Sequence, residues 1–498
     1  MATYYVAEGG TATDQAKENA TSGTYPTGCL SPAGHNAETF AAGDSILFSD
    51  EGGVIRATVT PPSSGSSGSP ITYGAKSGDS PVISGADLVT GWTPEGTANI
   101  WEAALTTEPN QVYMDGTFGD ERSGIGDMSG EYDWYWSSNV LYVYAATDPD
   151  ARYTSPGVAA NVRSQTIQST DNDYLTFQNI TCQYAQHKHS GSAKMVGITC
   201  QDMVYQEIGQ GTGTSYINGL YTYGVDGLLV RRCTAYKCGW NGMSFEGGNS
   251  ATALTDIVIE ENDCYENWHN GIDFKPTAGG IDITGPVIRY NLLRDNYSNG
   301  LILWNNDTAG DYSIDDAVVY GNVIYGNAEA GINIGVNSTS LYHSGCLIYN
   351  NTIYGNGVGS GANGPGIFLQ GTGCEIKNNI LSENQQDDGF DHEILTNDDG
   401  GDANVVDYNV VYNSSHTNIY KIDGSSYTAA NIFSSVGMQE HGVHSDPLFT
   451  NAGGEDFTLT SSSPAKGTAV NLGASYDDGL RPGSSWTDAV LTGDRDNY

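Results

Sequence analysis

Short runs of β-favouring apolar residues recur at a regular spacing through the middle of this chain. Each run is followed by a turn that contains Asn, then by a Gly and a second stretch in which apolar and polar residues alternate. The aligned segments are Leu228–Gly248, Ile257–Pro276, Val287–Asn305, Val318–Val336, Leu347–Gln370 and Glu375–Glu393. A repeat of roughly thirty residues is too short for a globular domain, so each unit must bury its apolar face by stacking on its neighbours.

Two columns of asparagine fix how these units align. The first column contains Asn262, Asn291, Asn322, Asn351, Asn379 and Asn409, and the second contains Asn267, Asn296, Asn327, Asn356 and Asn384. Stacked Asn amides can hydrogen-bond along a ladder, and Asn tolerates the left-handed backbone of a turn. The ladder explains the N-x-[ST] matches at these turns better than glycosylation does.

The strand after each Gly alternates between core and solvent. The residues expected in the core are Met243, Ile272, Leu301, Ile332 and Ile367, and then Phe245, Phe274, Leu303, Ile334 and Leu369. The residues between them face solvent on one parallel sheet. The pattern predicts an all-β fold, a right-handed parallel β-helix in which one chain forms a solenoid of roughly thirty residues per coil.

The period fails near both ends of the chain. We expect an N-terminal cap and first coils over 1–87, an inserted β-rich lobe over 88–155, the main β-helix over 156–435 and a C-terminal cap over 436–498. Aromatic runs such as Trp134-Tyr135-Trp136 indicate hairpins in the lobe. A terminal cap is expected because the last coil of a solenoid must be covered.

Composition narrows the function. The 498 residues carry a formal net charge of -40, with 59 acidic and 19 basic residues, and no basic stripe suitable for nucleic acid. Such acidity indicates bound divalent cations or a salty environment, or it serves solubility. No apolar run is long enough to cross a membrane. The start at Met1 has no signal-peptide pattern, yet we expect an extracellular protein that reaches its destination by another route or after trimming.

These features resemble the bacterial right-handed β-helix proteins that include pectate lyases, alginate lyases and mannuronan epimerases. The segment from Asn384 to Asp391 contains Asp387-Asp388-Gly389-Phe390-Asp391, which is similar to the calcium motif of family nine pectate lyases. The segment Asn418–Gly424 resembles the one that carries their lysine base. The resemblance implies that Asp387, Asp388 and Asp391 bind Ca²⁺ and that Lys421 is the catalytic base.

The chemistry of that arrangement is coherent. Calcium prefers oxygen ligands, and a bound uronate carboxylate would complete its coordination. The cation would stabilise the enolate-like charge while neutral Lys421 removes the α-proton. If Gly389 and Ile419 are equivalent, Asp391 and Lys421 share one outward column. The alternative is an acidic turn beside a solvated lysine, with any calcium purely structural.

A second candidate site lies on the outward sheet earlier in the chain. Asp273 and Lys275 are the outward pair of one strand, Glu246 lies in the column of Lys275 one coil earlier, and Trp304 one coil later. The segment is loosely similar to the Y-G-F-D-P-H stretch of mannuronan epimerases, with Lys275 in place of the histidine. Glu246 and Asp273 could also be the acid and base of a glycoside hydrolase, or the group could be a surface salt bridge.

Apolar residues on the same face favour a binding role. Trp240 and His269 share a column before the turn, and Phe368 and Trp304 are outward apolar residues that suit the apolar faces of sugar rings. The His187-Lys188-His189 cluster is either a metal site or a polar loop. Cys346 and Cys374 begin adjacent coils, so a disulfide between them stays open.

The sequence therefore predicts a calcium-assisted lyase of an acidic, uronate-containing polysaccharide. Two alternatives remain: a hydrolase or epimerase that uses Glu246, Asp273 and Lys275, and a non-catalytic adhesin or fibre that only binds glycan. Fibre-type helices generally form trimers, and we expect a monomer.

Overall fold

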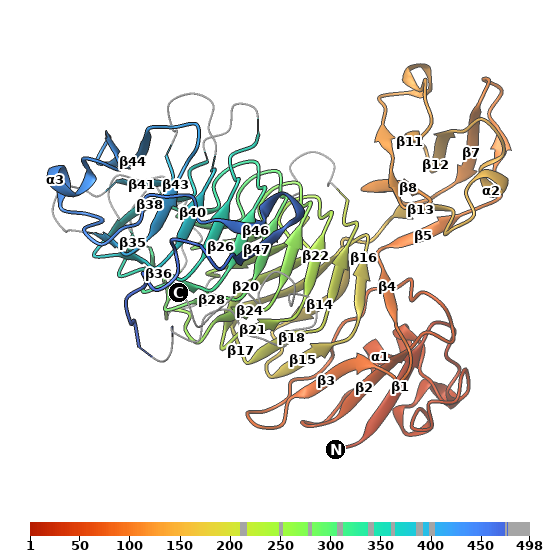
Figure 1. Cartoon of the computed structure of the whole chain (residues 1–498). Helices are drawn as coiled ribbons and strands as arrows, with labels where there is room; N and C mark the ends of the chain where they lie inside the picture. The colour runs from red at the N-terminus through yellow and green to blue at the C-terminus, as the bar shows by residue number, and fades with distance from the viewer. Residues whose placement is uncertain are drawn as a thin grey trace. The chain divides into compact units, whose positions relative to one another are not determined.

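The computed structural model is built mainly from short β-strands (Figure 1). It describes residues 1–209, 217–248, 252–276, 281–305, 312–336, 343–359, 364–384, 392–397, 404–473 and 476. The chain divides into two compact units. The first contains Met1–His189, Met203–Tyr221 and Tyr236–Trp240, and the second contains Ser190–Asp202, Thr222–Ala235 and Asn241–Tyr498.

The first unit contains two parallel sheets and a short helix. One sheet pairs β1 (Thr3–Ala7), β2 (Ser45–Ser49), β3 (Ile71–Ala75) and β15 (Leu175–Gln178) in that order. The other pairs β4 (Val82–Ser84), β16 (Thr181–Gln183) and β19 (Val204–Gln206). The helix α1 (Pro32–Ala37) begins at Ser31, whose hydroxyl accepts a hydrogen bond from the backbone N–H of Gly34.

An antiparallel lobe interrupts this unit between β4 and β15. Its first sheet contains β5 (Ala86–Val89), β13 (Val158–Asn161), β8 (Gln111–Met114) and β9 (Thr117–Phe118). Its second contains β10 (Asp120–Glu121), β11 (Asp133–Ser137), β12 (Val140–Tyr144), β7 (Ile100–Ala104) and β6 (Thr93–Pro94). The short helix α2 (Pro149–Arg152) follows β12. Trp134 is buried in the core of this lobe. The strands of the lobe lie between Ala86 and Asn161, a range that includes the predicted segment 88–155.

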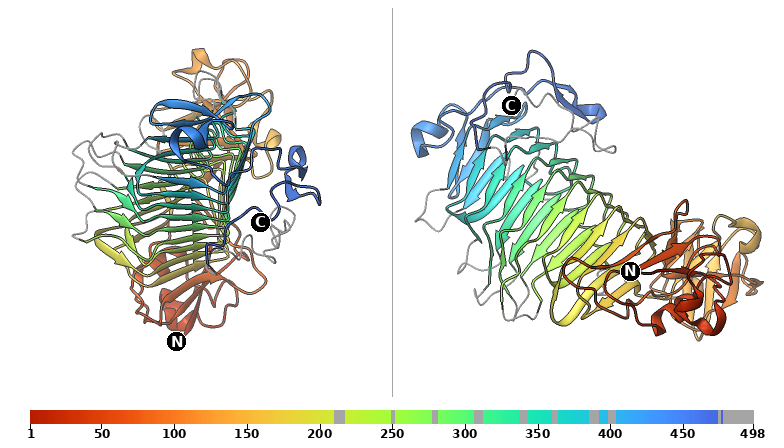
Figure 2. Two further views of the ribbon diagram at one scale, coloured as in Figure 1. Left: turned by 60° about the vertical axis from the view of Figure 1, so that its left-hand side comes forward. Right: turned by 90° about the horizontal axis from the view of Figure 1, so that it is seen from below.

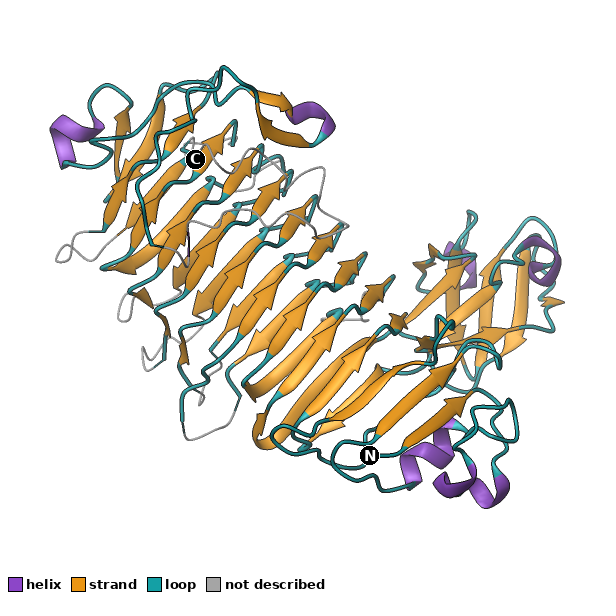
Figure 3. Ribbon diagram, turned by 60° about the horizontal axis from the view of Figure 1, so that its bottom comes forward, coloured by secondary structure: helices purple, strands orange, loops and turns teal. Residues whose placement is uncertain are grey.

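The second unit is a parallel β-helix whose coils each contribute one strand to each of three sheets (Figures 2 and 3). The first sheet contains β18 (Ile198–Gln201), β21 (Leu229–Arg231), β24 (Val258–Glu260), β28 (Val287–Arg289), β32 (Val318–Tyr320), β36 (Leu347–Tyr349), β39 (Glu375–Lys377) and β42 (Val405–Asp407). The second contains β25 (Asp263–Tyr265), β29 (Leu292–Arg294), β33 (Val323–Tyr325), β37 (Thr352–Tyr354), β40 (Ile380–Ser382) and β43 (Val410–Tyr412).

The third sheet carries the outward columns in which the sequence places chemistry. It contains β23 (Met243–Glu246), β26 (Ile272–Lys275), β30 (Leu301–Asn305), β34 (Ile332–Val336), β38 (Ile367–Thr372), β41 (Ile394–Asn397) and β44 (Asn418–Ile422). A last strand, β45 (Ser425–Thr428), pairs with β44 antiparallel. The predicted core residues of these strands, from Met243 to Leu369, are buried, which confirms the inward register.

Both asparagine ladders form inside the second unit. In each, the backbone N–H and the side-chain Nδ2 of one Asn donate to Oδ1 of the Asn one coil later, as Asn262 donates to Asn291 at 3.0 and 2.9 Å. Nδ2 also donates to a backbone carbonyl, in this case that of Val230 at 3.1 Å. Every amide group is thus satisfied without water, which allows a fully buried polar column.

The C-terminal part covers the sheets with short elements. The helix α3 (Ile432–Val436) ends at Gly437, whose φ is 73°, and the hairpin of β46 (Phe449–Asn451) and β47 (Asp456–Leu459) follows. Phe457 of the hairpin packs on Tyr325 and Tyr354 of the second sheet. Within the described residues, no helix is both long and apolar enough to span a bilayer. All cysteines, including Cys346 and Cys374, are buried free thiols.

Candidate functional site

One pocket opens on the third sheet of the β-helix, over strands β26, β30 and β34. Its volume is about 310 Å³. The residues that line it are His269, Asn270, Lys275, Ser298, Asn299, Ile302, Trp304, Glu329 and Asn333. Three of the residues predicted from the sequence, His269, Lys275 and Trp304, therefore come together at one place.

The three strands supply the floor of the pocket, and the turns that precede them supply one wall. Asp273, Ile302 and Asn333 occupy the same position on adjacent strands. The turns are also hydrogen-bonded to each other: the N–H of Ser298 donates to the carbonyl of His269 at 3.0 Å, and the N–H of Glu329 donates to that of Ser298 at 2.9 Å. His269, Ser298 and Glu329 thus form the wall as one column.

Asp273 differs from the sequence expectation because its side chain is completely buried. Its Oδ2 accepts a hydrogen bond from Asn241 Nδ2 at 2.7 Å and forms an ion pair with Lys275 Nζ at 2.8 Å. Burial raises the pKa of Asp273, while Lys275 and Asn241 favour its ionised form. Asp273 Oδ1 is buried and has no hydrogen-bond partner among the described residues. Asp273 therefore holds Lys275 from below rather than facing solvent beside it.

A third, short ladder of asparagines lies under the pocket. Asn270 donates to Asn241 Oδ1 from Nδ2 at 3.0 Å, and Asn299 donates to Asn270 Oδ1 from Nδ2, also at 3.0 Å. Because Asn241 donates to a carboxylate, which can only accept, the orientation of all three amides is determined. The amides therefore connect Asp273 at one end to the far side of the pocket at the other.

At the far side, the ladder ends on the carboxylate of Glu329. Asn299 Nδ2 donates to Glu329 Oε2 at 2.9 Å, and Ser298 Oγ donates to the same oxygen at 2.6 Å. Two donors on one oxygen fix the direction of the carboxylate. Glu329 is partly exposed and lines the pocket, so it is a charged group that a ligand can reach.

The same amide network contacts His269. Its Nδ1 lies 2.6 Å from Asn270 Nδ2 and 3.2 Å from Asn241 Oδ1. Burial, together with the charge of Lys275, lowers the pKa of His269 to about 4. At neutral pH the imidazole is therefore uncharged, with one ring nitrogen as a donor and the other as an acceptor.

The indole ring of Trp304 lies against the next strand at Gly335, which has no side chain to keep the ring away. A Cβ atom added to Gly335 would lie 2.6 Å from the indole ring of Trp304. Asn333, beside this glycine, donates to Asn299 Oδ1 at 3.3 Å, whereas its own Oδ1 is buried and has no partner among the described residues. The pocket therefore contains both the aromatic ring of Trp304 and a polar atom, Asn333 Oδ1, that has no hydrogen bond within the described residues.

The remaining predicted residues of the outward face are not among the residues that line the pocket. Glu246 ends β23, is partly exposed, and its Cα pairs with that of Lys275. Phe368 is a partly exposed residue of β38 whose Cα pairs with that of Asn333. Trp240 is partly exposed and belongs to the first unit, whereas the pocket belongs to the second.

The predicted calcium site is only partly described. Asp387, Asp388 and Asp391 lie outside the described residues. Lys421 is partly exposed on β44, and its Cα pairs with that of Leu395. The predicted equivalence of Asp391 and Lys421 is wrong, because the strand that pairs with β44 begins after Asp391, where Ile394 fills the core position opposite Tyr420.

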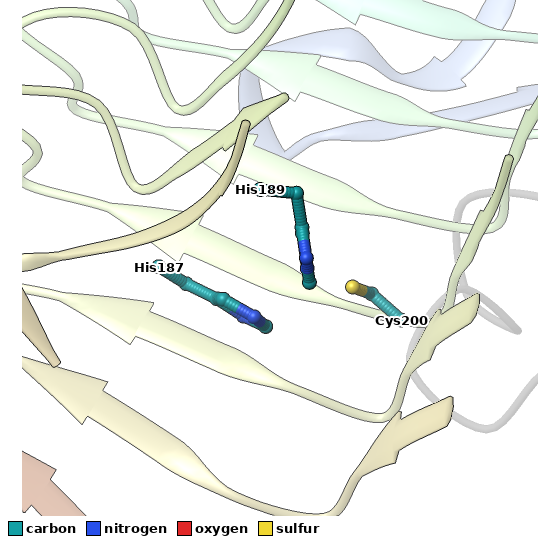
Figure 4. Close-up of side chains that lie close together, drawn as sticks. All are labelled: His187, His189 and Cys200. Atoms are coloured by element: carbon teal, nitrogen blue, oxygen red, sulfur yellow. The ribbon is translucent and has the colours of Figure 1, made fainter. Parts of the chain in front are cut away.

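His187 and His189 lie in the core rather than in a polar loop. They are alternate residues of β17 (Gln186–Val196), both are fully buried, and their ring centroids are 4.5 Å apart. Figure 4 draws the two rings together with Cys200. Burial lowers the pKa of both imidazoles, to about 3 for His189, so they are neutral at physiological pH. His187 also packs edge-on against Phe177.

Sequence reasoning missed Glu329 and the short ladder. The ladder had a visible signal, since Asn241, Asn270 and Asn299 each precede a Gly at the start of an outward strand. Glu329 had none, because its coil carries Ala330 where the others carry Asn. Only the hydrogen-bonded turns show that Glu329 follows His269 and Ser298 in one column.

Comparison with known proteins supports the fold. A family model described as a right-handed β-helix region matches residues 218–435. The solved complex of XylC with xylose has a TM-score of 0.58 and 16% identity over 85% of this chain and 86% of that chain. A glycoside hydrolase has a TM-score of 0.47 and 10% identity, covering 85% and 95% of the two chains.

The A-module of the mannuronan C-5 epimerase AlgE4 from Azotobacter vinelandii has a TM-score of 0.45 and 12% identity, covering 89% and 97% of the two chains. No curated protein matches the chain significantly. The predicted right-handed parallel β-helix is confirmed, and at these identities the likeness concerns the fold.

Proposed function

We propose that this chain is an enzyme that hydrolyses a glycosidic bond of a polysaccharide bound at the pocket of Lys275, Trp304 and Glu329. The observation that carries the proposal is the position of the Glu329 carboxylate. It lines the pocket, two side-chain donors hold it in a fixed direction, and an aromatic floor lies in the same pocket. This is the combination that recognition and cleavage of a sugar require.

The lining suits a ligand rich in hydroxyl groups. Trp304 and Ile302 provide the apolar surface on which the C–H face of a sugar ring packs. Lys275 is a donor, the neutral His269 ring offers both a donor and an acceptor, and Glu329 and the Oδ1 of Asn333, which has no partner among the described residues, are acceptors. A hydroxyl both donates and accepts, so a sugar satisfies both kinds of group.

The reaction needs a base and an acid on either side of the bond. In the proposed mechanism the carboxylate of Glu329 removes a proton from water as the water attacks the anomeric carbon. Glu246, which lies beside Lys275 on the outward face, donates a proton to the leaving glycosidic oxygen. Lys275, held by Asp273, binds substrate hydroxyls and fixes the ring between the two carboxyl groups.

Charge favours hydrolysis over β-elimination at this pocket. Elimination from a uronate needs a group that neutralises the substrate carboxylate. Here the charge of Lys275 is matched by Asp273 at 2.8 Å, and Glu329 adds a further negative charge. The pocket is therefore better suited to an uncharged sugar than to a uronate.

Replacing Glu329 tests the proposal. With xylan, β-glucan, alginate and polygalacturonate as substrates, we expect new reducing ends without an ultraviolet-absorbing product, and Glu329→Gln should slow the reaction by about a thousandfold. The matched control is Glu440→Gln, an exposed carboxylate outside the pocket lining. Unchanged hydrolysis by folded Glu329→Gln would rule this residue out as the base.

Calcium-assisted β-elimination remains the second candidate, supported by the motif Asp387-Asp388-Gly389-Phe390-Asp391 and by the partly exposed Lys421. Here Asp387, Asp388 and Asp391 would hold Ca²⁺ and Lys421 would be the base. An unsaturated product that absorbs in the ultraviolet, and that disappears with a chelator or in Lys421→Ala but not in Glu329→Gln, would establish it. Glycan binding without turnover would instead favour an adhesin. Either enzyme would act as a secreted monomer on extracellular polysaccharide.

A further inference from the structure

Two exposed aromatic rings stand next to the wall of the pocket. Trp268 is 47% exposed and Tyr297 is 64% exposed, and both are among the large hydrophobic side chains that the described part of the protein leaves in solvent. Their ring centroids are 5.4 Å apart and their planes differ by 9°, so the rings are stacked parallel. Each ring therefore covers part of the other's face, and the pair leaves ring edges and outer ring faces in solvent on two coils of the β-helix.

The rings belong to the same turns as the pocket wall. Trp268 directly precedes His269, and Tyr297 directly precedes Ser298. The N–H of Tyr297 donates to the carbonyl of Asn267 at 2.9 Å, which holds the two turns in register. On the third coil the equivalent position is Ala328, next to Glu329, and its N–H donates to Asn296 at 2.8 Å. The aromatic column therefore runs beside the pocket wall and gives way to a small residue at the candidate base.

Burial explains why these aromatics are not part of the core. The Asn that precedes each of them in the long ladder, Asn267 and Asn296, is buried, whereas the next residue on each turn points outward. Packing against the coils would need space that the ladder occupies. An exposed, rigid aromatic pair beside a polar pocket is typical of a binding surface rather than of a folding requirement.

We infer that Trp268 and Tyr297 form a platform on which the sugar rings of an uncharged polysaccharide stack as the chain leaves the pocket. The inference rests on the proposed function of the pocket and adds a subsite and a substrate class. The exposed parts of the two rings lie on adjacent coils about 4.8 Å apart, so two sugars of one chain can each contact an aromatic ring.

The charges around the platform select the class of glycan. Glu266 and Asp295 precede Asn267 and Asn296 on the same two turns and are exposed. The cation Arg294 of the second sheet is paired with Asp263 at 3.1 Å and lies 3.8 Å from Asp295. The surroundings are therefore acidic, and a polyuronate would be repelled.

Binding to soluble polysaccharides in affinity gels tests the platform independently of turnover. The full-length chain with Glu329→Gln is compared with the same chain carrying Trp268→Ala and Tyr297→Ala. We expect binding to xylan, β-glucan or galactomannan to weaken by roughly tenfold. The matched control is Phe433→Ala, an aromatic of α3 that is 49% exposed. The conservative pair Trp268→Phe and Tyr297→Phe should keep most of the affinity and shows that the fold is intact.

A second measurement separates the platform from the pocket. In the active protein, the double alanine variant should raise KM for a long polysaccharide and leave kcat/KM for a short oligosaccharide unchanged. If the double variant also lowers kcat/KM for the short oligosaccharide, the substitutions damage the pocket itself, and this result would overturn the inference. Unchanged binding of neutral chains, tighter binding of polygalacturonate, or no binding of any glycan would also overturn it. If glycans bind through the rings but nothing is hydrolysed, the platform stands and the proposed reaction fails.

Discussion

The β-helix contains two kinds of asparagine ladder, and their ends differ. The long ladders run through the turns between sheets and end in the core, one of them on Gln439 and the other on Glu393. The short ladder of Asn241, Asn270 and Asn299 begins at Asp273 and ends on Glu329 in the pocket. The same hydrogen-bonding unit thus seals the core in one place and orients a reachable carboxylate in another.

The difference is one of exposure rather than of bonding. Glu393 is completely buried, and accepts from Asn384 Nδ2 at 2.5 Å and Asn413 Nδ2 at 2.9 Å. Glu329 has a comparable set of donors but opens to the pocket. An asparagine ladder that ends on a buried side chain stabilises the fold, whereas one that ends on a carboxylate at the pocket can position that carboxylate for function. The following experiments test this difference.

The largest effect is expected for Asn322→Ala, in the middle of the first long ladder. The change removes Oδ1 of Asn322, which accepts from the backbone N–H and Nδ2 of Asn291 at 2.9 and 3.0 Å, and it removes Nδ2, which donates to the carbonyl of Ile288. We expect a loss of about 4 kcal/mol in the free energy of unfolding, measured by denaturant titration. Activity per folded molecule should not change. A much smaller loss in the free energy of unfolding would mean that a water molecule takes the place of the side-chain amide of Asn322.

The second effect concerns the pH dependence of stability through Glu393. Burial raises its pKa to about 8 from an ordinary value of 4.5. Between these values the unfolded chain releases a proton that the folded chain keeps, so this contribution to stability falls as the pH rises. The slope is about 1.4 kcal/mol per pH unit, or about 3 kcal/mol from pH 5 to pH 7.

Comparison with Glu393→Gln isolates this contribution from the other acidic groups. The variant should lose less stability than the unaltered protein as the pH rises from 5 to 7. The measurement is the midpoint of denaturant unfolding at each pH. Parallel curves for the two proteins would show that Glu393 does not titrate in this range.

The third effect, on activity, is expected for Asn299→Ala at the end of the short ladder. Glu329 would lose the donor at 2.9 Å, and Asn270 Oδ1 would lose the side-chain donor at 3.0 Å and keep the backbone N–H of residue 299 at 3.1 Å. We expect kcat to fall by about thirtyfold, equivalent to about 2 kcal/mol, with little change in KM, because a misdirected base still allows binding. A rise in KM alone would assign Asn299 to substrate binding instead of positioning.

The sequence predicted the fold well because each coil repeats the same physical constraints. Alternation after each Gly identified the inward residues, and the long ladders set the register of neighbouring coils. The site was harder because it depends on where the repeat changes. Asp273 follows the outward pattern, yet its side chain is completely buried, with Asn241 Nδ2 at 2.7 Å and Lys275 Nζ at 2.8 Å from its Oδ2. Alternation predicts a direction and not an exposed area.

The register near Lys421 was wrong for a related reason. The segment between Asn384 and Glu393 is rich in acidic residues and offers several alignments with the next coil. The buried pairing of Ile394 with Tyr420 decides between them, and it places Leu395 rather than Asp391 beside Lys421. A hydrophobic core contact therefore overrules a match to a short motif, because shifting a strand would expose its inward residues.

The smallest effect is expected for Gly335→Ala, which tests how the floor of the pocket is built. The added methyl would lie 2.6 Å from the indole of Trp304 and 2.9 Å from Asn333 Oδ1, so the ring must tilt away from the strand. The change is confined to the pocket, and a tilted ring still packs on part of a sugar, so we expect KM to rise by about fivefold, equivalent to about 1 kcal/mol, with kcat unchanged. Gly453→Ala, where an added Cβ has no atom within 4 Å, is the control for the effect of the methyl group itself. Equal kinetics for both variants would show that Trp304 does not need its flat position, and the aromatic floor would then matter less than the carboxylate above it.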